Sequence, residues 1–154
     1  MIKRKIDRYL ADFFDTHKKA LMLTGARQIG KTYSIRRFGH EHFERFVEIN
    51  FIENPGLVKV FSKAKNCQDI FLRLSTVTSQ DLIKGNTLVF FDEVQECPEI
   101  VTAIKFLVEE GSYRYILSGS LLGVEIKNLR SAPVGYLPCA AAVSSTSWSV
   151  LVSP

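Results

Sequence analysis

A glycine-rich segment near the N-terminus carries the residue types that surround a phosphate group. Residues 25–32 read GARQIGKT, which matches the pattern G-x-x-x-x-G-K-[ST]. Gly25 and Gly30 allow the chain to turn tightly, so that main-chain N–H groups can surround an anion. Lys31 can reach the β- and γ-phosphate oxygens, and the Thr32 hydroxyl can bind Mg²⁺. The residues expected to contact a nucleoside triphosphate here are Gly25, Ala26, Arg27, Gln28, Ile29, Gly30, Lys31, Thr32 and Tyr33.

Two adjacent carboxylates follow a second apolar segment, LVFFDE, at residues 88–93. An aspartate at the tip of such a strand holds Mg²⁺ together with the hydroxyl of the phosphate loop, so Thr32 and Asp92 are the expected metal ligands. Glu93 can polarise the water that attacks the γ-phosphate, and with Lys31 it forms the expected catalytic pair. The second carboxylate favours hydrolysis over transfer to a small molecule. The chain lacks an N-K-x-D element for reading guanine, which favours ATP as the substrate.

A third segment, YILSGS, ends in two serines that could contact the γ-phosphate or its attacking water. Ser120 is included among the residues expected to bind the nucleotide, and Ser118 is the alternative for the contact with the γ-phosphate. A plain Ser-Gly turn explains the same residues equally well. Arg114 and Arg130 could supply an arginine that stabilises the transferring phosphoryl group, although surface solvation is the commoner fate of such residues.

The hydrophobic pattern predicts the elements that position these groups. Short apolar or β-rich runs predict strands, and apolar residues recurring every three to four positions predict helices. In one helix Pro98 occupies the first turn and Gly111 follows the end, whereas Gly39 is expected to stop another. Alternating strands and helices favour right-handed crossovers and an α/β, three-layer fold with a mostly parallel sheet. The expected strands are 20–25, 45–51, 86–93 and 113–120, and the expected helices are 2–16, 31–38, 54–65, 68–75 and 98–110.

Length and composition narrow the class of protein. The 154 residues, 46% of them hydrophobic, fit one globular domain. No apolar run is long enough for a membrane span or a secretory signal. The three cysteines lie far apart, which favours a reducing cytoplasm over a disulfide framework. Residues 1–40 carry a charge balance of +7 and the remainder −3; the basic part suits a phosphate ligand, nucleic acid or simply a solvated helix face.

Five segments together resemble a prokaryotic AAA-type P-loop ATPase family: GARQIGKT, EINF, TLVFFDEVQECPEI, YILSGSLLG and APVGYL. The resemblance covers about residues 1–137. It implies binding of ATP with Mg²⁺, a sheet of strand order 5-1-4-3-2, and allows self-association as a homo-oligomer. Members of that family usually carry a second, C-terminal domain of unknown function.

The end of the chain departs from this family. Residues 131–154 contain no charged residue, and residues 138–154 are small and serine-rich. We therefore expect an ATPase core over 1–137 and a disordered or artefactual tail over 138–154, as in a truncated or frameshifted product. Residues 133–137, PVGYL, are the doubtful candidate for a fifth strand.

Three functions remain open on these grounds. The first is a Mg-dependent ATPase. The second is a switch or scaffold that binds ATP with negligible turnover because the C-terminal domain is missing. The third is a DNA-associated ATPase that uses Lys3, Arg4 and Lys5 on the basic first helix.

Overall fold

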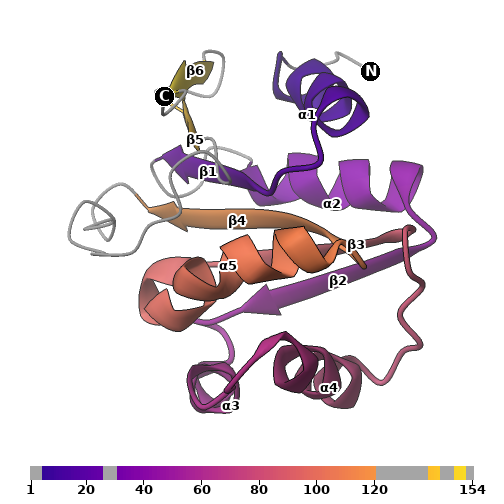
Figure 1. Cartoon of the computed structure of the whole chain (residues 1–154). Coiled ribbons are helices and arrows are strands. Elements are labelled where there is room, and N and C mark those ends of the chain that lie inside the picture. The colour runs from indigo at the N-terminus through magenta and orange to yellow at the C-terminus, as the bar shows by residue number, and fades with distance from the viewer. Residues whose placement is uncertain (1–4, 26–30, 121–138, 143–147, 152–154) are drawn as a thin grey trace.

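A mostly parallel β-sheet forms the centre of the molecule (Figure 1). The computed structural model describes residues 5–25, 31–120, 139–142 and 148–151. The strand order is β2-β3-β4-β1-β5-β6; neighbouring strands from β2 to β5 run parallel, and β6 is antiparallel to β5. The strands are β1 Leu21–Gly25, β2 Arg45–Asn50, β3 Thr87–Asp92, β4 Arg114–Ser120, β5 Cys139–Ala142 and β6 Trp148–Leu151.

Helices cover both faces of this sheet and so create three layers (Figure 1). On one face α1 and α2 pack against Leu21, Leu23, Phe90 and other strand residues, and on the opposite face α3, α4 and α5 pack against a second buried cluster. The predicted α/β three-layer class is therefore confirmed. No helix in the described parts of the chain is long and apolar enough to cross a membrane. The helices are α1 Lys5–Thr16, α2 Lys31–His42, α3 Pro55–Ser62, α4 Cys67–Thr78 and α5 Pro98–Glu110, with a short 3₁₀ helix, η1, at Val94–Glu96.

Strand β3 is buried along its whole length. All six of its residues are buried, because β2 and β4 flank it and helices cover both of its faces. Alternate side chains face opposite layers: Leu88 and Phe90 face α1 and α2, whereas Val89 and Phe91 face α3, α4 and α5. This alternation places Asp92, the last residue of β3, on the same face as α2.

Helix α5 has the boundaries that its sequence predicts. Pro98 is its first residue, and Gly111 caps its end in the left-handed conformation with φ 79°. The Gly111 N–H donates to the carbonyl oxygen of Leu107 at 3.2 Å. This bond gives a hydrogen-bond partner to a carbonyl group in the last turn of the helix. Proline and glycine therefore predict both ends of this helix correctly.

The expected stop of α2 at Gly39 is wrong. The helix continues to His42, and Gly39 is buried inside it. A Cβ atom at Gly39 would lie 2.3 Å from Cδ2 of the Phe46 ring on β2. Glycine is therefore present because the helix approaches the sheet closely at this point, and the helix does not end there.

The C-terminal part of the sheet also differs from the sequence-based expectation. Residues 133–137 lie outside the described residues, and the position beside β1 is occupied by β5, at Cys139–Ala142. Strand β6 then adds a sixth position that the resemblance does not include. Both strands fall within residues 138–154, the tail expected to lack order. Strand β5 pairs with β1 because the edge of β1 offers N–H and C=O groups that a parallel neighbour can satisfy. The boundary between core and tail at Leu137 stays a prediction.

Candidate functional site

The segments with the predicted site residues meet at one edge of the sheet. Strands β1 to β4 are parallel, so their carboxyl ends lie together; the arrows of β1, β2 and β4 point to the left in Figure 1. Gly25 ends β1, and Lys31 begins α2. The intervening residues of the glycine-rich segment lie outside the described residues. The segment thus joins a strand to the N-terminus of a helix, where the helix dipole favours an anion. These intervening residues are Ala26, Arg27, Gln28, Ile29 and Gly30.

The structure brings together the two residues expected to bind a metal ion. The Thr32 hydroxyl, in the first turn of α2, donates to Oδ2 of Asp92 at 3.4 Å. These residues are 60 positions apart in the sequence. Asp92 is only 6% exposed, whereas Thr32 is half-buried. The approach of a helix-start hydroxyl to a strand-end carboxylate is the arrangement that the two motifs predict.

The Asp92 carboxylate receives two further hydrogen bonds. Asn50, directly opposite Asp92 in the β2–β3 register, donates from Nδ2 to Oδ2 at 3.2 Å. The main-chain N–H of Glu93 donates to Oδ1 at 2.9 Å. An ionised carboxylate accepts hydrogen bonds only, and donors of this kind allow it to remain charged at a buried position.

Sequence reasoning did not assign Asn50 to the site. Its Oδ1 accepts from the N–H groups of Ile52 and Glu53, each at 2.9 Å, so its amide group is held with Nδ2 toward Asp92. The signal was present in the segment EINF. A polar residue that ends a strand of a parallel sheet lies at the edge where ligands bind.

Glu93 has an uncommon backbone conformation. Its φ and ψ angles are 58° and 48°, which is the left-handed region that residues other than glycine seldom adopt. This turn takes the chain from β3 directly into η1. The Glu93 side chain is half-buried, and its Oε2 accepts from Nε2 of Gln95 at 2.6 Å. Strained residues of this kind often lie at functional sites.

The two candidate serines lie on the strand next to β3. Ser118 is opposite Asp92 in the β3–β4 register and is fully buried. Its hydroxyl has no hydrogen-bond partner among the residues that the structure describes. Ser120 is opposite Gly25 in the β1–β4 register. Their roles at a phosphate, and the choice between them, stay predictions.

Arg114 does not belong to this site. It begins β4, at the opposite edge of the sheet, and donates to the carbonyl oxygens of Phe14 at 3.2 Å and His17 at 2.5 Å. Its guanidinium carbon lies 4.5 Å from the centre of the Phe14 ring. Burial lowers the pKa of Arg114, and its role is to hold the end of α1. Arg114 is therefore too far away to act as an arginine finger at the site of its own chain, and its half-buried guanidinium is not a freely solvated surface group. A role in trans stays a prediction, and Arg130 lies outside the described residues.

Ion pairs account for part of the positive charge of the first 40 residues. Arg36 forms two hydrogen bonds of 2.7 Å with the Glu48 carboxylate, and these raise the pKa of Arg36. Arg37 pairs with Asp7 and lies 6.0 Å from the ring centre of Tyr33, which is 54% exposed. The contact expected between Tyr33 and a nucleotide stays a prediction, as does the DNA contact expected of residues 3–5.

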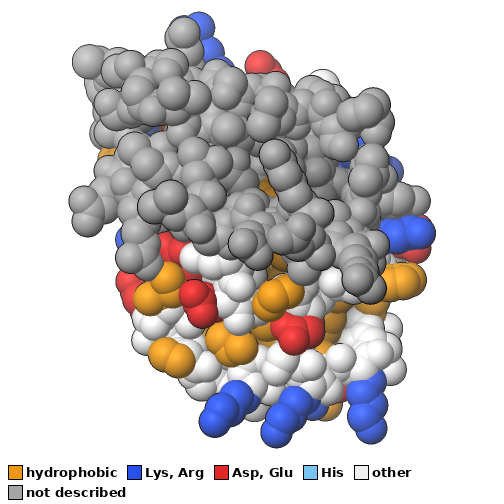
Figure 2. Space-filling model, turned by 90° about the vertical axis from the view of Figure 1, so that its left-hand side faces the viewer, with side chains coloured by type: hydrophobic (Ala, Val, Ile, Leu, Met, Phe, Trp, Pro, Cys, Tyr) orange, Lys and Arg blue, Asp and Glu red, His pale blue; other side chains and the backbone are white. Residues whose placement is uncertain are grey.

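The surface at the carboxyl edge is not uniformly basic. Figure 2 looks onto this edge, where acidic and hydrophobic side chains lie next to the region drawn in grey. Lys and Arg side chains gather at the lower rim of this view, on the side of α3 and α4. The described part of this edge therefore offers no continuous basic surface in this view.

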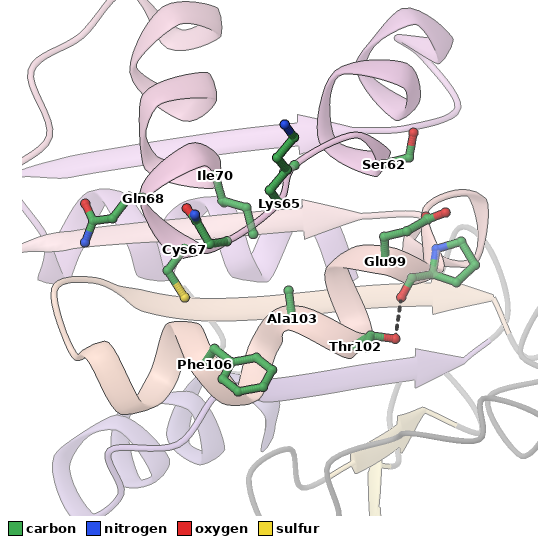
Figure 3. A pocket seen from close by; sticks show the side chains of 12 residues that line it. Ser62, Lys65, Cys67, Gln68, Ile70, Glu99, Thr102, Ala103 and Phe106 are labelled. Atoms are coloured by element: carbon green, nitrogen blue, oxygen red, sulfur yellow. Dashed lines mark hydrogen bonds between the residues drawn. The ribbon is translucent and has the colours of Figure 1, made fainter.

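A cavity of about 690 Å³ lies elsewhere, between α5 and the start of α4. Cys67 and Ile70 of α4 face Ala103 and Phe106 of α5 across it (Figure 3). None of the predicted site residues lines this cavity. The candidate site is therefore identified by its hydrogen bonds and motifs, and not by this hollow.

Comparison with known proteins gives a family match over most of the chain. A family model for an AAA domain matches residues 17–139. Comparison with curated proteins gives no match. Among solved structures, PCH-2 of C. elegans is similar at 15% identity and a TM-score of 0.48, over 90% of this chain and 40% of that chain. The flagellar accessory protein FlaH of Methanocaldococcus jannaschii is similar at 7% identity and a TM-score of 0.47, over 81% of this chain and 71% of that chain.

Proposed function

Because this chain belongs to the AAA domain family of nucleotide-binding P-loop ATPases, we propose that it binds ATP with Mg²⁺ and hydrolyses ATP to ADP and phosphate. One observation carries the proposal. The Thr32 hydroxyl, at the start of the helix that follows the glycine-rich segment, lies 3.4 Å from the Asp92 carboxylate at the end of β3. A chance glycine turn would not require a strand-end carboxylate at this distance.

In this proposal the start of α2 binds the triphosphate. The main-chain N–H groups of residues 25–32 surround the phosphates, and the positive end of the α2 dipole favours their charge. Lys31 holds the β- and γ-phosphate oxygens. Ser118 or Ser120, on the neighbouring strand, contacts the γ-phosphate or the attacking water.

The residues at this edge suit a hard cation. Thr32 and Asp92 supply oxygen donors, and the buried Asp92 carboxylate is already held in place by its donors. In the described parts of the chain no three His, Cys, Asp or Glu side chains group as metal ligands. A Mg²⁺ site with one or two protein ligands completed by phosphate oxygens and water is consistent with this finding. When bound, Mg²⁺ would neutralise charge on the β- and γ-phosphates.

Glu93 would act as the general base for the water that attacks the γ-phosphorus. The water oxygen forms the new P–O bond, the bond between the γ-phosphorus and the bridging oxygen breaks, and ADP leaves with that oxygen. Glu93 orients the water and accepts its proton. This role is supported by the sequence, in which Glu93 directly follows the proposed metal ligand Asp92.

Purified wild-type chain, Glu93→Gln and Lys31→Ala test the proposal. Wild type should bind Mg-ATP in a titration and release phosphate. Glu93→Gln should keep ATP binding and lose most turnover, because the amide cannot accept the proton. Lys31→Ala should lose binding and turnover together. Unchanged phosphate release by Glu93→Gln would refute its role, and wild type that binds without turnover would support the switch instead.

A further inference from the structure

The side chain of Gln95 donates a hydrogen bond to Glu93, the proposed general base. It lies in η1, and its Nε2 donates to Oε2 of Glu93 at 2.6 Å. A carboxylate oxygen can only accept, so the contact requires the NH₂ side of the amide to face Glu93. The other amide atom, Oε1, is buried and has no hydrogen-bond partner among the described residues.

Packing holds the backbone that carries this contact. Glu96 N–H donates to the Glu93 carbonyl oxygen at 3.1 Å, and Cys97 N–H donates to the Val94 carbonyl oxygen at 3.0 Å. Val94 and Cys97, on either side of Gln95, are buried in the core beneath α5. The left-handed turn at Glu93 and the 3₁₀ turn after it therefore set the direction of both side chains.

Among the described residues no donor reaches Oε1, and this argues against a purely structural role. A buried acceptor without a partner lowers the stability of the folded chain, and an apolar side chain of similar size would avoid that loss. Gln95 thus provides a donor to Glu93 while its own acceptor is unsatisfied. An unsatisfied buried polar group in a native structure needs an explanation, and a role in catalysis is one.

We propose that Gln95 is a positioning residue that fixes the rotation of the Glu93 carboxylate for attack by water. This inference rests on the ATPase function proposed above. Gln95 donates the same hydrogen bond before and after the reaction and neither gains nor loses a proton, which passes from water to Glu93. Without this bond the carboxylate loses one of the contacts that fix its rotation toward the attacking water, and the rate falls although the nucleotide still binds.

Steady-state hydrolysis and ATP binding of Gln95→Leu test this role. The kcat should fall about 10- to 100-fold, whereas KM and the dissociation constant for Mg-ATP should stay within about twofold. The Tm should not fall, because leucine removes an unsatisfied buried acceptor. Gln80→Leu is the matched control, since Gln80 is exposed in the turn after α4, and it should behave as wild type. Gln95→Met provides a second, unbranched replacement if leucine prevents folding.

A double variant separates positioning from an independent effect. In a Glu93→Gln background, Gln95→Leu should cause no further loss, because the two residues act through one carboxylate. An unchanged or raised kcat in Gln95→Leu, a weaker affinity for ATP, or a further loss in the double variant would overturn the inference. If Glu93→Gln is inactive while Gln95→Leu matches wild type, only this inference fails. If wild type does not turn over, both it and the proposed ATPase function fail.

Discussion

Replacing Asn50 with alanine removes the side chain that joins the ends of β2 and β3. Asn50 donates to the Asp92 carboxylate at 3.2 Å and accepts from the N–H groups of Ile52 and Glu53 at 2.9 Å each. The change therefore affects the turn after β2 and the position of a predicted metal ligand at once. Both effects can be measured in the same variant.

The cost can be estimated from these contacts. Ile52 and Glu53 are exposed, so water can replace the two hydrogen bonds that their N–H groups lose. The bond to Asp92 is different, because that carboxylate is 6% exposed and water cannot easily replace the amide. A hydrogen bond to a charged group contributes about 1.5–3 kcal/mol, so we expect a loss of about 2 kcal/mol. For a chain of this size this corresponds to a fall in Tm of roughly 4–8 °C.

Thermal unfolding and Mg-ATP titration measure the two effects of Asn50→Ala. With its amide donor removed, Asp92 can leave its position near Thr32, and we expect about tenfold weaker binding of Mg-ATP. Asn54→Ala is the matched control: Asn54 precedes α3, is exposed and makes no side-chain cap hydrogen bond. If Asn50→Ala lowers the Tm no more than Asn54→Ala does, the role assigned to the Asn50 amide is wrong.

Three further predictions concern stability and reactivity. Gly39→Ala should lower the Tm, because the new Cβ atom would lie 2.3 Å from the Phe46 ring. This clash costs about 1–3 kcal/mol, whereas the gain in helix propensity is about 1 kcal/mol. A raised Tm would contradict the close approach of α2 to Phe46. The Arg73 hydrogen bond lowers the pKa of Asp69, so the stability that the Asp69 carboxylate contributes is present above the pKa of the unfolded state and is lost as the pH falls through the pKa of the folded state. Asp69→Asn should therefore lower the free energy of unfolding more at pH 7 than at pH 2. Equal losses at the two pH values would contradict this contribution. Burial raises the pKa of Cys97 to about 12, so iodoacetamide at pH 8 should label this residue by mass spectrometry only after unfolding, and labelling of the native chain would show that it is accessible.

The approach of Thr32 to Asp92 could be predicted because each residue ends a local pattern with a known direction. A strand, a glycine-rich turn and a helix place Thr32 at the carboxyl edge of a parallel sheet, and the apolar run of β3 leads Asp92 to the same edge. The same rule would have excluded Arg114, which starts its strand and so lies at the opposite edge. Closeness in the sequence to Ser118 and Ser120 does not imply closeness in space, because a strand separates its two ends by its whole length.

Contacts between separate elements explain why no role was predicted for Asn50 and why the predicted role of Gly39 is wrong. The segment EINF and the expected strand order place Asn50 at the carboxyl edge beside β3, but the register that sets its side chain opposite Asp92 is not encoded by local residue types. Gly39 resembles a helix stop because glycine has low helix propensity, but the ring of Phe46, on the following strand, requires its small size. In both cases a contact between separate elements determined the outcome. Short-range patterns predict elements better than they predict such contacts.

The Asp92 carboxylate links the stability of the fold to the proposed chemistry. Hydrogen-bond donors to it come from at least three separate places in the described parts of the chain: the start of α2, the end of β2 and the turn after β3. Burying a carboxylate without donors is costly, and these donors meet at Asp92 only when the sheet and α2 are assembled. In the proposed function, an oxygen of this carboxylate would therefore be oriented for the metal before nucleotide binds. The proposed site would be preorganised by the same hydrogen bonds that hold the ends of the strands together.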